Sequence, residues 1–182
     1  PTLSDAPRSI VATEDEALEA DLASFFTNPD RIALAYDIRS ADGSDAPAWL
    51  LQPAPSETQL AGTPLNEHVG VTDLLLTARN ATGFSLSTTV RLSVQNTNDA
   101  PYAASLPATP VAIDEGQSWQ VPADTFVDVD VGDRLTLSAT LADGSALPIW
   151  LSFDTDSATF RADTPHEPDV TIEVRATATD IG

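Results

Sequence analysis

The chain has 182 residues, which is long enough for one large domain or two ordinary ones. Because 42% of the residues are hydrophobic, the composition is not that of a disordered chain. Its 8 Lys and Arg against 28 Asp and Glu give a formal net charge of −20, which excludes unassisted binding to nucleic acid or to an anionic membrane and favours small cations as partners. The absence of cysteine excludes disulfides, zinc–thiolate sites and thiol nucleophiles.

Short alternating runs typical of β-strands follow one another along the chain, with Asp-Gly, Pro and Asn between them. The clearest of these runs are 33–38, 90–94, 135–141 and 170–175. The segment 14–26 has the composition of a helix. Its counterpart, 114–126, contains Gly and Pro and cannot form a good helix. Both segments are therefore predicted to be a strand plus a loop, with a single turn near 21–25.

The sequence matches itself at an offset of 100 to 101 residues. Trp49-Leu50 returns as 150–151, at an offset of 101, and Asp5-Ala6-Pro7 returns as 99–101, at a shorter offset of 94. The matches keep one order, which includes Phe26 with Phe126, Asp42-Gly43-Ser44 with Asp143-Gly144-Ser145, and Thr63-Pro64 with Thr164-Pro165. We interpret this order as two copies of one domain, residues 1–98 and 99–182.

Each copy is predicted to be a seven-strand Greek-key β-sandwich, because the strands are short and separated by frequent turns. The second copy stops at Gly182, directly after the segment that precedes the last strand of the first copy. We therefore expect this sandwich to lack its last strand and to have an exposed edge. Either the full protein continues beyond this segment or another chain supplies that strand.

An acidic loop follows Phe126 in the second copy. Asp128, Asp130 and Asp133 lie close together in sequence around Gly132. Carboxylates so close repel one another unless water screens them or a cation binds them. Ca²⁺ prefers six to eight oxygen ligands and commonly binds short acidic loops with a glycine at the sharp bend. The loop is therefore a candidate calcium site, with a solvated acidic loop as the alternative.

The chain also resembles a known family over nearly its whole length. Residues 13–30, beginning TEDEAL, resemble the start of a bacterial cadherin-like domain. In the second copy, FVDVDVGD at 126–133 and LPIWLSFD at 147–154 resemble the dystroglycan-type cadherin-like domain. The linker NTNDAP at 96–101 is similar to the linker between cadherin repeats. The resemblance implies two tandem Ig-like sandwiches with calcium at their junction.

Carried over residue by residue, the resemblance implies a set of calcium ligands and a weaker second set upstream. The first set is Asp15 (or Glu14), Asn98, Asp99, Asp128, Asp130 and Asp180. The second set is Asp5, Asn28, Asp30 and Asn80, weakened by the neighbouring Arg31. The Asp-Arg-Glu tripeptide of animal cadherins is replaced by 61–64, AGTP, so one or two ions per junction are expected rather than three.

The remaining polar and aromatic features have simpler interpretations. The turns at Asp42-Gly43 and Asp143-Gly144 are predicted to be plain hairpin turns, and Trp49 and Trp150 are predicted to pack in the cores. Trp119 is either partly buried or a carbohydrate-stacking platform. His68 and His166 lack paired ligands for zinc. Paired carboxylates could suggest a glycosidase, but a sandwich of this size rarely forms the necessary cleft, so no enzyme activity is expected.

These features predict a calcium-stiffened segment of a bacterial surface or secreted protein, serving in adhesion or as a spacer. Its expected partners are neighbouring repeats of the same chain, a surface glycan or protein, or a second copy. The alternative is a carbohydrate- or protein-binding module of a secreted polysaccharide-degrading enzyme. The sequence shows neither a membrane-spanning run nor a signal peptide, and it reads as a segment of a longer protein.

Overall fold

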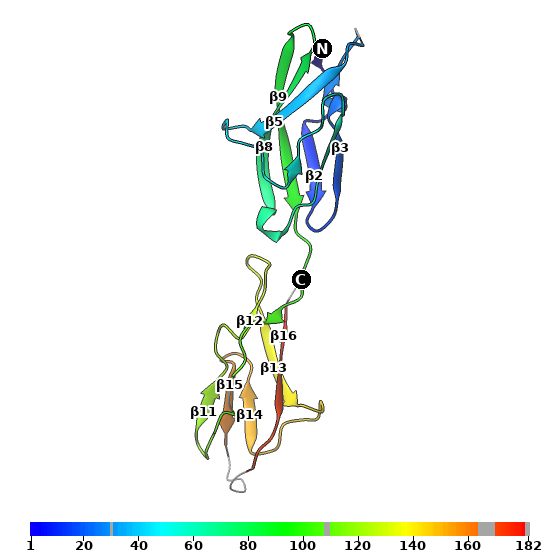
Figure 1. The fold of residues 1–182 in the computed structure, drawn as a ribbon. Helices are drawn as coiled ribbons and strands as arrows, with labels where there is room; N and C mark the ends of the chain where they lie inside the picture. The colour runs from blue at the N-terminus through cyan, green and yellow to red at the C-terminus, as the bar shows by residue number, and fades with distance from the viewer. Residues whose placement is uncertain (30, 108–109, 164–169, 181–182) are drawn as a thin grey trace. The chain divides into compact units, whose positions relative to one another are not determined.

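The structure is a computed structural model that describes residues 1–29, 31–107, 110–163 and 170–180. The contacts divide the chain into two compact units, Pro1–Thr97 and Asn98–Gly182 (Figure 1). Regular structure in the described residues consists of β-strands and two short 3₁₀-helices, so the all-β prediction is confirmed. Among these residues, no helix is long and apolar enough to cross a membrane.

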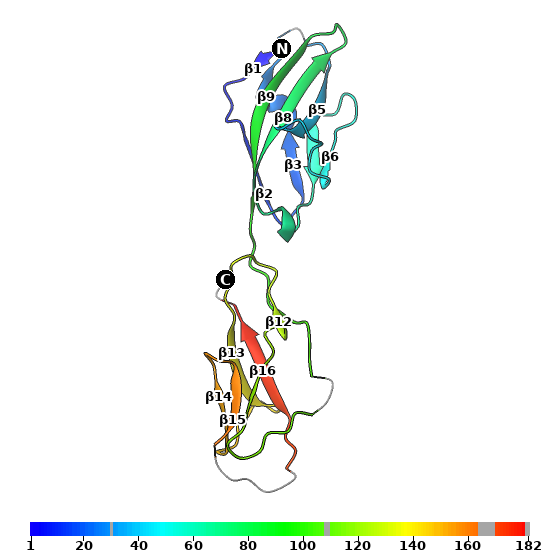
Figure 2. The ribbon, with the colours of Figure 1, turned by 90° about the vertical axis from the view of Figure 1, so that its left-hand side faces the viewer.

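One layer of the first unit is a four-stranded sheet in the order β2-β9-β8-β5 (Figure 2). Its strands are β2 (Ser9–Thr13), β5 (Leu34–Ser40), β8 (Gly70–Asn80) and β9 (Ser85–Gln95). The strands β8 and β9 form a long antiparallel hairpin, whereas β2 runs parallel to β9. The hairpin turn is stabilised by the side-chain oxygen of Asn80, which accepts hydrogen bonds from the N–H groups of Thr82 and Phe84.

The opposite layer contains the three-stranded sheet β3-β7-β6 and the small pair β1-β4. Its strands are β1 (Thr2–Leu3), β3 (Leu18–Asp21), β4 (Phe26–Thr27), β6 (Leu50–Leu51) and β7 (Gln59–Gly62). Apolar side chains from both layers form one core, in which Leu60, Leu74 and Leu92 are at most 1% exposed. This alternation of buried and exposed positions is what period-2 patterning predicts for strands with one face in a core.

The segment 14–26 forms a strand and one helical turn, as predicted. It contains β3, then the 3₁₀-helix η1 (Leu22–Phe25), and the first residue of β4. The carboxylate of Asp21 caps η1 by accepting a hydrogen bond from the N–H of Ala23. A second 3₁₀-helix, η2, covers Asn66–His68. The helical composition is overridden by sheet pairing, because residues 18–21 pair with β7.

Trp49 and Trp150 are partly buried, and each packs against the core of its own unit, as predicted. In the first unit Gly62 makes the close packing of Trp49 possible. A Cβ atom at position 62 would overlap the carbonyl oxygen of Trp49 and would lie 2.9 Å from its ring atom Cε3. The absence of a side chain at Gly62 is therefore part of the packing of this tryptophan.

The second unit contains three small sheets in the described residues: β10-β12, β11-β15-β14 and β13-β16. Its strands are β10 (Tyr102–Ala103), β11 (Ser118–Gln120), β12 (Phe126–Val127), β13 (Thr136–Leu141), β14 (Leu151–Asp154), β15 (Thr159–Ala162) and β16 (Val174–Thr179). Val121, Leu151 and Phe160 form the buried centre of its core. The predicted match at Thr164-Pro165 lies outside the described residues.

The strand predicted over 170–175 is wrong in its first part, because residues 170–173 form no strand and β16 begins at Val174. The first unit gives the physical reason. There, residues 70–73 of β8 pair only with β9, and pairing with β5 begins at Leu74. The described part of the second unit has no counterpart of β9, so residues 170–173 have no strand with which to pair.

The core of the first unit predicts a strong contrast between two neighbouring leucines. Leu60→Ala should lower the free energy of unfolding by about 2–5 kcal/mol, because Leu60 is fully buried and its removal leaves a cavity. Leu51 lies on β6, next to β7 in the same sheet, and is 63% exposed. Leu51→Ala should therefore change the free energy of unfolding by less than about 0.5 kcal/mol. Urea denaturation of both variants measures the contrast, and equal losses would contradict this description of the core.

Candidate metal centre

The acidic loop that follows β12 brings three carboxylates together within the second unit. Asp128, Asp130 and Asp133 each offer an oxygen, and these oxygens all lie within 4.8 Å of one another. The loop is folded by its own hydrogen bonds: the N–H of Asp130 donates to Oδ1 of Asp128 at 2.9 Å, and the N–H of Asp133 donates to the carbonyl of Asp130 at 3.3 Å. Gly132 has φ = 101°, a conformation that other residues rarely adopt, and so allows the bend.

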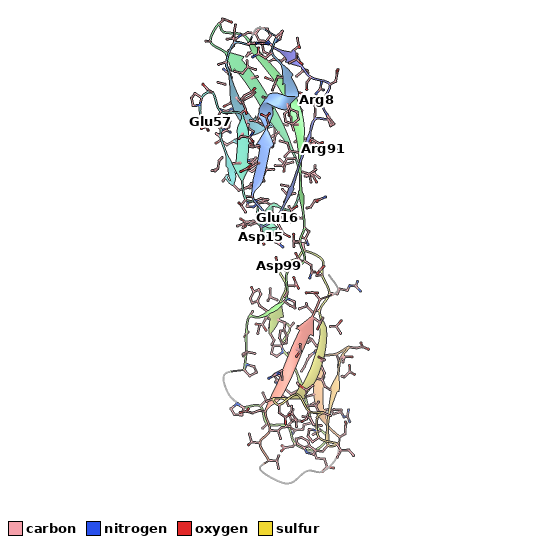
Figure 3. The ribbon with its side chains drawn as sticks, turned by 90° about the vertical axis from the view of Figure 1, so that its right-hand side faces the viewer. Arg8, Asp15, Glu16, Glu57, Arg91 and Asp99 are labelled. Atoms are coloured by element: carbon pink, nitrogen blue, oxygen red, sulfur yellow. The ribbon has the colours of Figure 1, made fainter. Side chains whose placement is uncertain are left out.

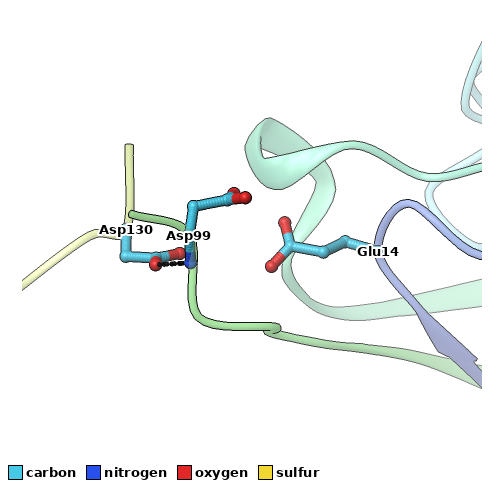
Figure 4. A group of neighbouring side chains, drawn as sticks. All are labelled: Glu14, Asp99 and Asp130. Atoms are coloured by element: carbon cyan, nitrogen blue, oxygen red, sulfur yellow. Dashed lines mark hydrogen bonds between the residues drawn. The ribbon is translucent and has the colours of Figure 1, made fainter. Parts of the chain in front are cut away.

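The loop also holds the start of the second unit. Oδ2 of Asp130 accepts a hydrogen bond of 2.7 Å from the N–H of Asp99, drawn as a dashed line in Figure 4. The side chain of Asp130 is 6% exposed, so its charge lies largely away from water. Asp99 is half-buried, whereas Asn98 is exposed. The structure therefore brings Asp99, Asp128 and Asp130 of the predicted ligand set together, and adds Asp133.

Two further observations describe the electrostatics of this loop. The pKa of Asp133 is raised, first by desolvation and then by the negative charges of Asp130, Asp128 and Asp180. Asp180, which directly follows β16, is therefore near the loop and is a fourth residue of the predicted ligand set. Oδ2 of Asp128 is buried and has no hydrogen-bond partner in the described part of the chain. A buried carboxylate oxygen without a partner is costly, and a bound cation would remove that cost.

In the first unit, the residue beside the linker is Glu14 rather than Asp15. Glu14 is 1% exposed, and its Oε1 accepts a hydrogen bond from the N–H of Thr97. Its other oxygen, Oε2, is buried without a partner among the described residues. Asp15 is exposed in the turn after β2, as is Glu16 (Figure 3). Strand alternation could have selected Glu14, because Ile10 and Ala12 of β2 are also buried.

The predicted upstream ligands that are described have local partners or are exposed. The side-chain N–H₂ of Asn28 donates to the carbonyl of Ile32 at 2.7 Å, and the side-chain oxygen of Asn80 accepts bonds in the β8–β9 turn. Asp5 is exposed, and Asp30 lies outside the described residues. Two of these oxygen- and nitrogen-bearing side chains therefore already stabilise loops. The upstream metal site stays a prediction.

The Asp-Gly segments form tight turns that their own side chains stabilise. Oδ1 of Asp42 accepts hydrogen bonds from the N–H and the hydroxyl of Ser44, and Asp143 is bonded to Ser145 in the same way. These bonds, the side-chain bond first, lower the pKa of both carboxyls. Both turns are exposed. The hairpin prediction is wrong in one respect, because the strands before and after each turn lie in different sheets: β5 and β6 in the first unit, β13 and β14 in the second.

Trp119, the one candidate carbohydrate contact, and His68 both have local structural roles. Trp119 is partly buried and stacks on Phe160 in the core of the second unit, with ring centroids 6.0 Å apart, so part of its ring is occupied by packing. In the first unit Nδ1 of His68 accepts a hydrogen bond from the N–H of Leu65, and its ring lies 5.8 Å from that of Trp49. His166 lies outside the described residues.

Comparisons with known proteins agree with this fold. Residues 96–181 match the family model described as He_PIG, a putative Ig domain. The first two domains of human protocadherin-24 align with a TM-score of 0.61 at 12% identity, covering 98% of this chain and 86% of that one. Those of chicken VE-cadherin align with a TM-score of 0.51 at 17% identity, covering 98% and 91%. The chain therefore has a cadherin-like Ig fold, and the sandwich prediction is confirmed. At these identities the likeness shows the fold alone.

An endo-fucoidan hydrolase of glycoside hydrolase family 107 also matches, at 20% identity and a TM-score of 0.43. The match covers 96% of this chain but only 27% of the hydrolase, and this likeness is too low to carry an argument about function. No curated protein sequence matches the chain. The finer predictions, namely a bacterial or dystroglycan-type family and two repeats, stay interpretations of the sequence.

The raised pKa of Asp133 predicts a pH dependence in calcium-free solution. A raised pKa in the folded state means that stability is greatest when the group is protonated and is lost as the pH rises through that folded pKa. Asp133→Asn should therefore be more stable than wild type at neutral pH, and the difference should shrink on acidification. Thermal melts of both proteins in chelator, between about pH 3.5 and 7, measure this difference in stability.

Asp156→Asn provides a control for this comparison, because Asp156 is an exposed residue of the turn between β14 and β15. The difference in stability between Asp156→Asn and wild type should not vary with pH, in contrast to the difference expected for Asp133→Asn. A difference between wild type and Asp133→Asn that does not vary with pH would show that the neighbouring charges do not act on Asp133.

Proposed function

We propose that the second unit binds Ca²⁺ through its acidic loop and that this binding stiffens the linker of a non-enzymatic, cadherin-like segment. The observation that supports it best is the buried Oδ2 of Asp128, which has no hydrogen-bond partner among the described residues and lies in a group of three carboxylates whose oxygens are within 4.8 Å of one another. The side chains of Asp99, Asp133 and Asp180, a carbonyl of the linker and water would complete a shell of six to eight oxygens.

The chemistry of these ligands favours calcium over other common cations. Every candidate ligand is an oxygen, whereas zinc sites are built mainly from thiolate and imidazole. Magnesium requires nearly ideal octahedral geometry and gives up its water reluctantly, which suits an irregular loop poorly. A chain with a net charge of −20 also gains from a divalent cation that neutralises part of its self-repulsion.

The mechanical consequence follows from which atoms hold the linker. Asp130 accepts from the N–H of Asp99, and Glu14 accepts from the N–H of Thr97. Both carboxylates that hold the linker main chain are therefore themselves candidate ligands. An ion that fixes Asp130 also fixes the bond to Asp99, so the chain between the units loses freedom. We propose Glu14, in place of Asp15, as the ligand from the first unit that the cadherin resemblance implies.

In an extracellular setting, where calcium is plentiful, such a segment would act as a stiff spacer or would carry an adhesive surface. A surface or secreted location and adhesion to a glycan, a protein or a second copy belong to this proposal. They are supported by the cadherin-like fold and the acidic composition. The carbohydrate-binding alternative is less favoured, because the ring of Trp119 packs against Phe160.

Calcium should stabilise the wild-type protein measurably. At a calcium concentration 100 times the dissociation constant, the free energy of unfolding should rise by about 2.7 kcal/mol. Asp128→Asn/Asp130→Asn should abolish this increment, as should a chelator. Asp143→Asn is the matched control. It removes one negative charge from a turn of the same unit and should leave the increment unchanged. Isothermal titration and thermal melts measure both quantities. A wild-type melt unaffected by calcium and chelator would reject the proposal.

Calcium should also restrict the motion of the linker. Because the chain has no cysteine, Thr89→Cys and Thr155→Cys would place one spin label on an exposed site in each unit. Calcium should narrow the distribution of distances between the labels, as measured by electron–electron double resonance. Glu14→Gln, which keeps an acceptor for Thr97 but loses the charge, should reduce this narrowing. Calcium binding without any narrowing would support a metal site and contradict the mechanical role.

A further inference from the structure

The strand β16 has a free edge on the side where the first unit has β9. In the first unit, β8 pairs with β5 on one side and with β9 on the other. In the second unit, β16 pairs with β13 in the equivalent register: Tyr36 faces Ala78, and Leu137 faces Ala178. Among the described residues, no strand pairs with the other edge of β16.

The free edge leaves the core of the second unit open. Leu74 of β8 is 1% exposed, whereas Val174, at the equivalent place in β16, is 41% exposed. Ala78 is fully buried and Ala178 is only partly so. Counted over the described residues, the core cluster has seventeen buried members in the first unit and three in the second. The second unit has apolar side chains for a core, but its described residues contain no strand equivalent to β9 to bury them.

Two other differences between the units have the same cause. Residues 110–113 correspond to the end of β2, a strand that pairs with β9 alone, and they form no strand. Residues 170–173 correspond to the part of β8 that pairs only with β9, and they also form no strand. A single strand in the place of β9 would therefore give three segments of the second unit a partner.

We propose that the free edge of β16 is a docking site for one extended segment that has the alternating pattern of β9 and runs antiparallel to β16. Main-chain hydrogen bonds would hold the segment, and alternate apolar side chains would close the core. In β9 these side chains include Val90, Leu92 and Val94, each at most 5% exposed. The only charge of β9 is that of Arg91, and a segment without negative charge suits an acidic chain.

The test adds such a segment to the chain. A copy of Gly83–Gln95, which contains a turn residue and β9, is appended after Gly182. A control chain carries the same copy with Val90→Asp, Leu92→Asp and Val94→Asp in the appended segment only. Both chains are compared with the original by hydrogen exchange read by mass spectrometry, in chelator so that calcium binding does not contribute. Exchange in β8 of the first unit, whose sequence the appended segment does not repeat, serves as the internal measure of correct folding.

The matched segment should slow exchange in β16 and in residues 110–113 and 170–173 by about tenfold or more, because these amides acquire strand partners. The aspartate control should not. Unchanged exchange with the matched segment, while the first unit stays protected, would overturn the proposal. So would β16 amides that are already protected in the original chain through a concentration-dependent dimer, since the occupant of the edge would then be the β16 of a second copy.

Discussion

Carboxylates in the second unit are held closer together than their repulsion alone would allow, because the main chain binds them. Asp128 accepts from the N–H of Asp130, and Asp130 accepts from the N–H of Asp99. Hydrogen bonds to charged acceptors are stronger than those between neutral groups, so they can hold an acidic loop in a folded form before any cation binds. A loop folded in advance binds an ion with less loss of conformational entropy. The linker is part of that arrangement, which is why a metal site and a mechanical role are proposed together.

The two units show how strongly a β-sandwich depends on each of its strands. The strand β9 is the partner of β8 and of β2 at once, and its inward side chains lie in the centre of the core. In the described part of the second unit no strand takes that place, and the differences extend well beyond one edge. They include the unpaired residues 110–113 and 170–173 and the exposure of Val174. Pairing partners, rather than intrinsic β-propensity, decide which of these segments become strands.

The sequence predicted those features that depend on local pattern. The alternation in 33–38 and 90–94, the turn at 21–25 and the Asp-Gly turns all correspond to observed structure. The carboxylates of the acidic loop were found because they are close in sequence. Features that depend on distant partners were harder to predict. The strand at 170–175 begins late because its partner is absent from the described residues, and Glu14 lies beside the linker because β2 directs it inward while Asp15 lies outside.

The bonds that hold the linker have a consequence for how its sequence can vary. Glu14 and Asp130 bind the main-chain N–H groups of Thr97 and Asp99, so these two contacts do not depend on which side chains the linker carries. Proline is the exception, because it has no N–H to donate. Natural variants should thus tolerate many residues at position 97 but exclude proline at 97 and 99, whereas replacement of either acceptor would release one end of the linker.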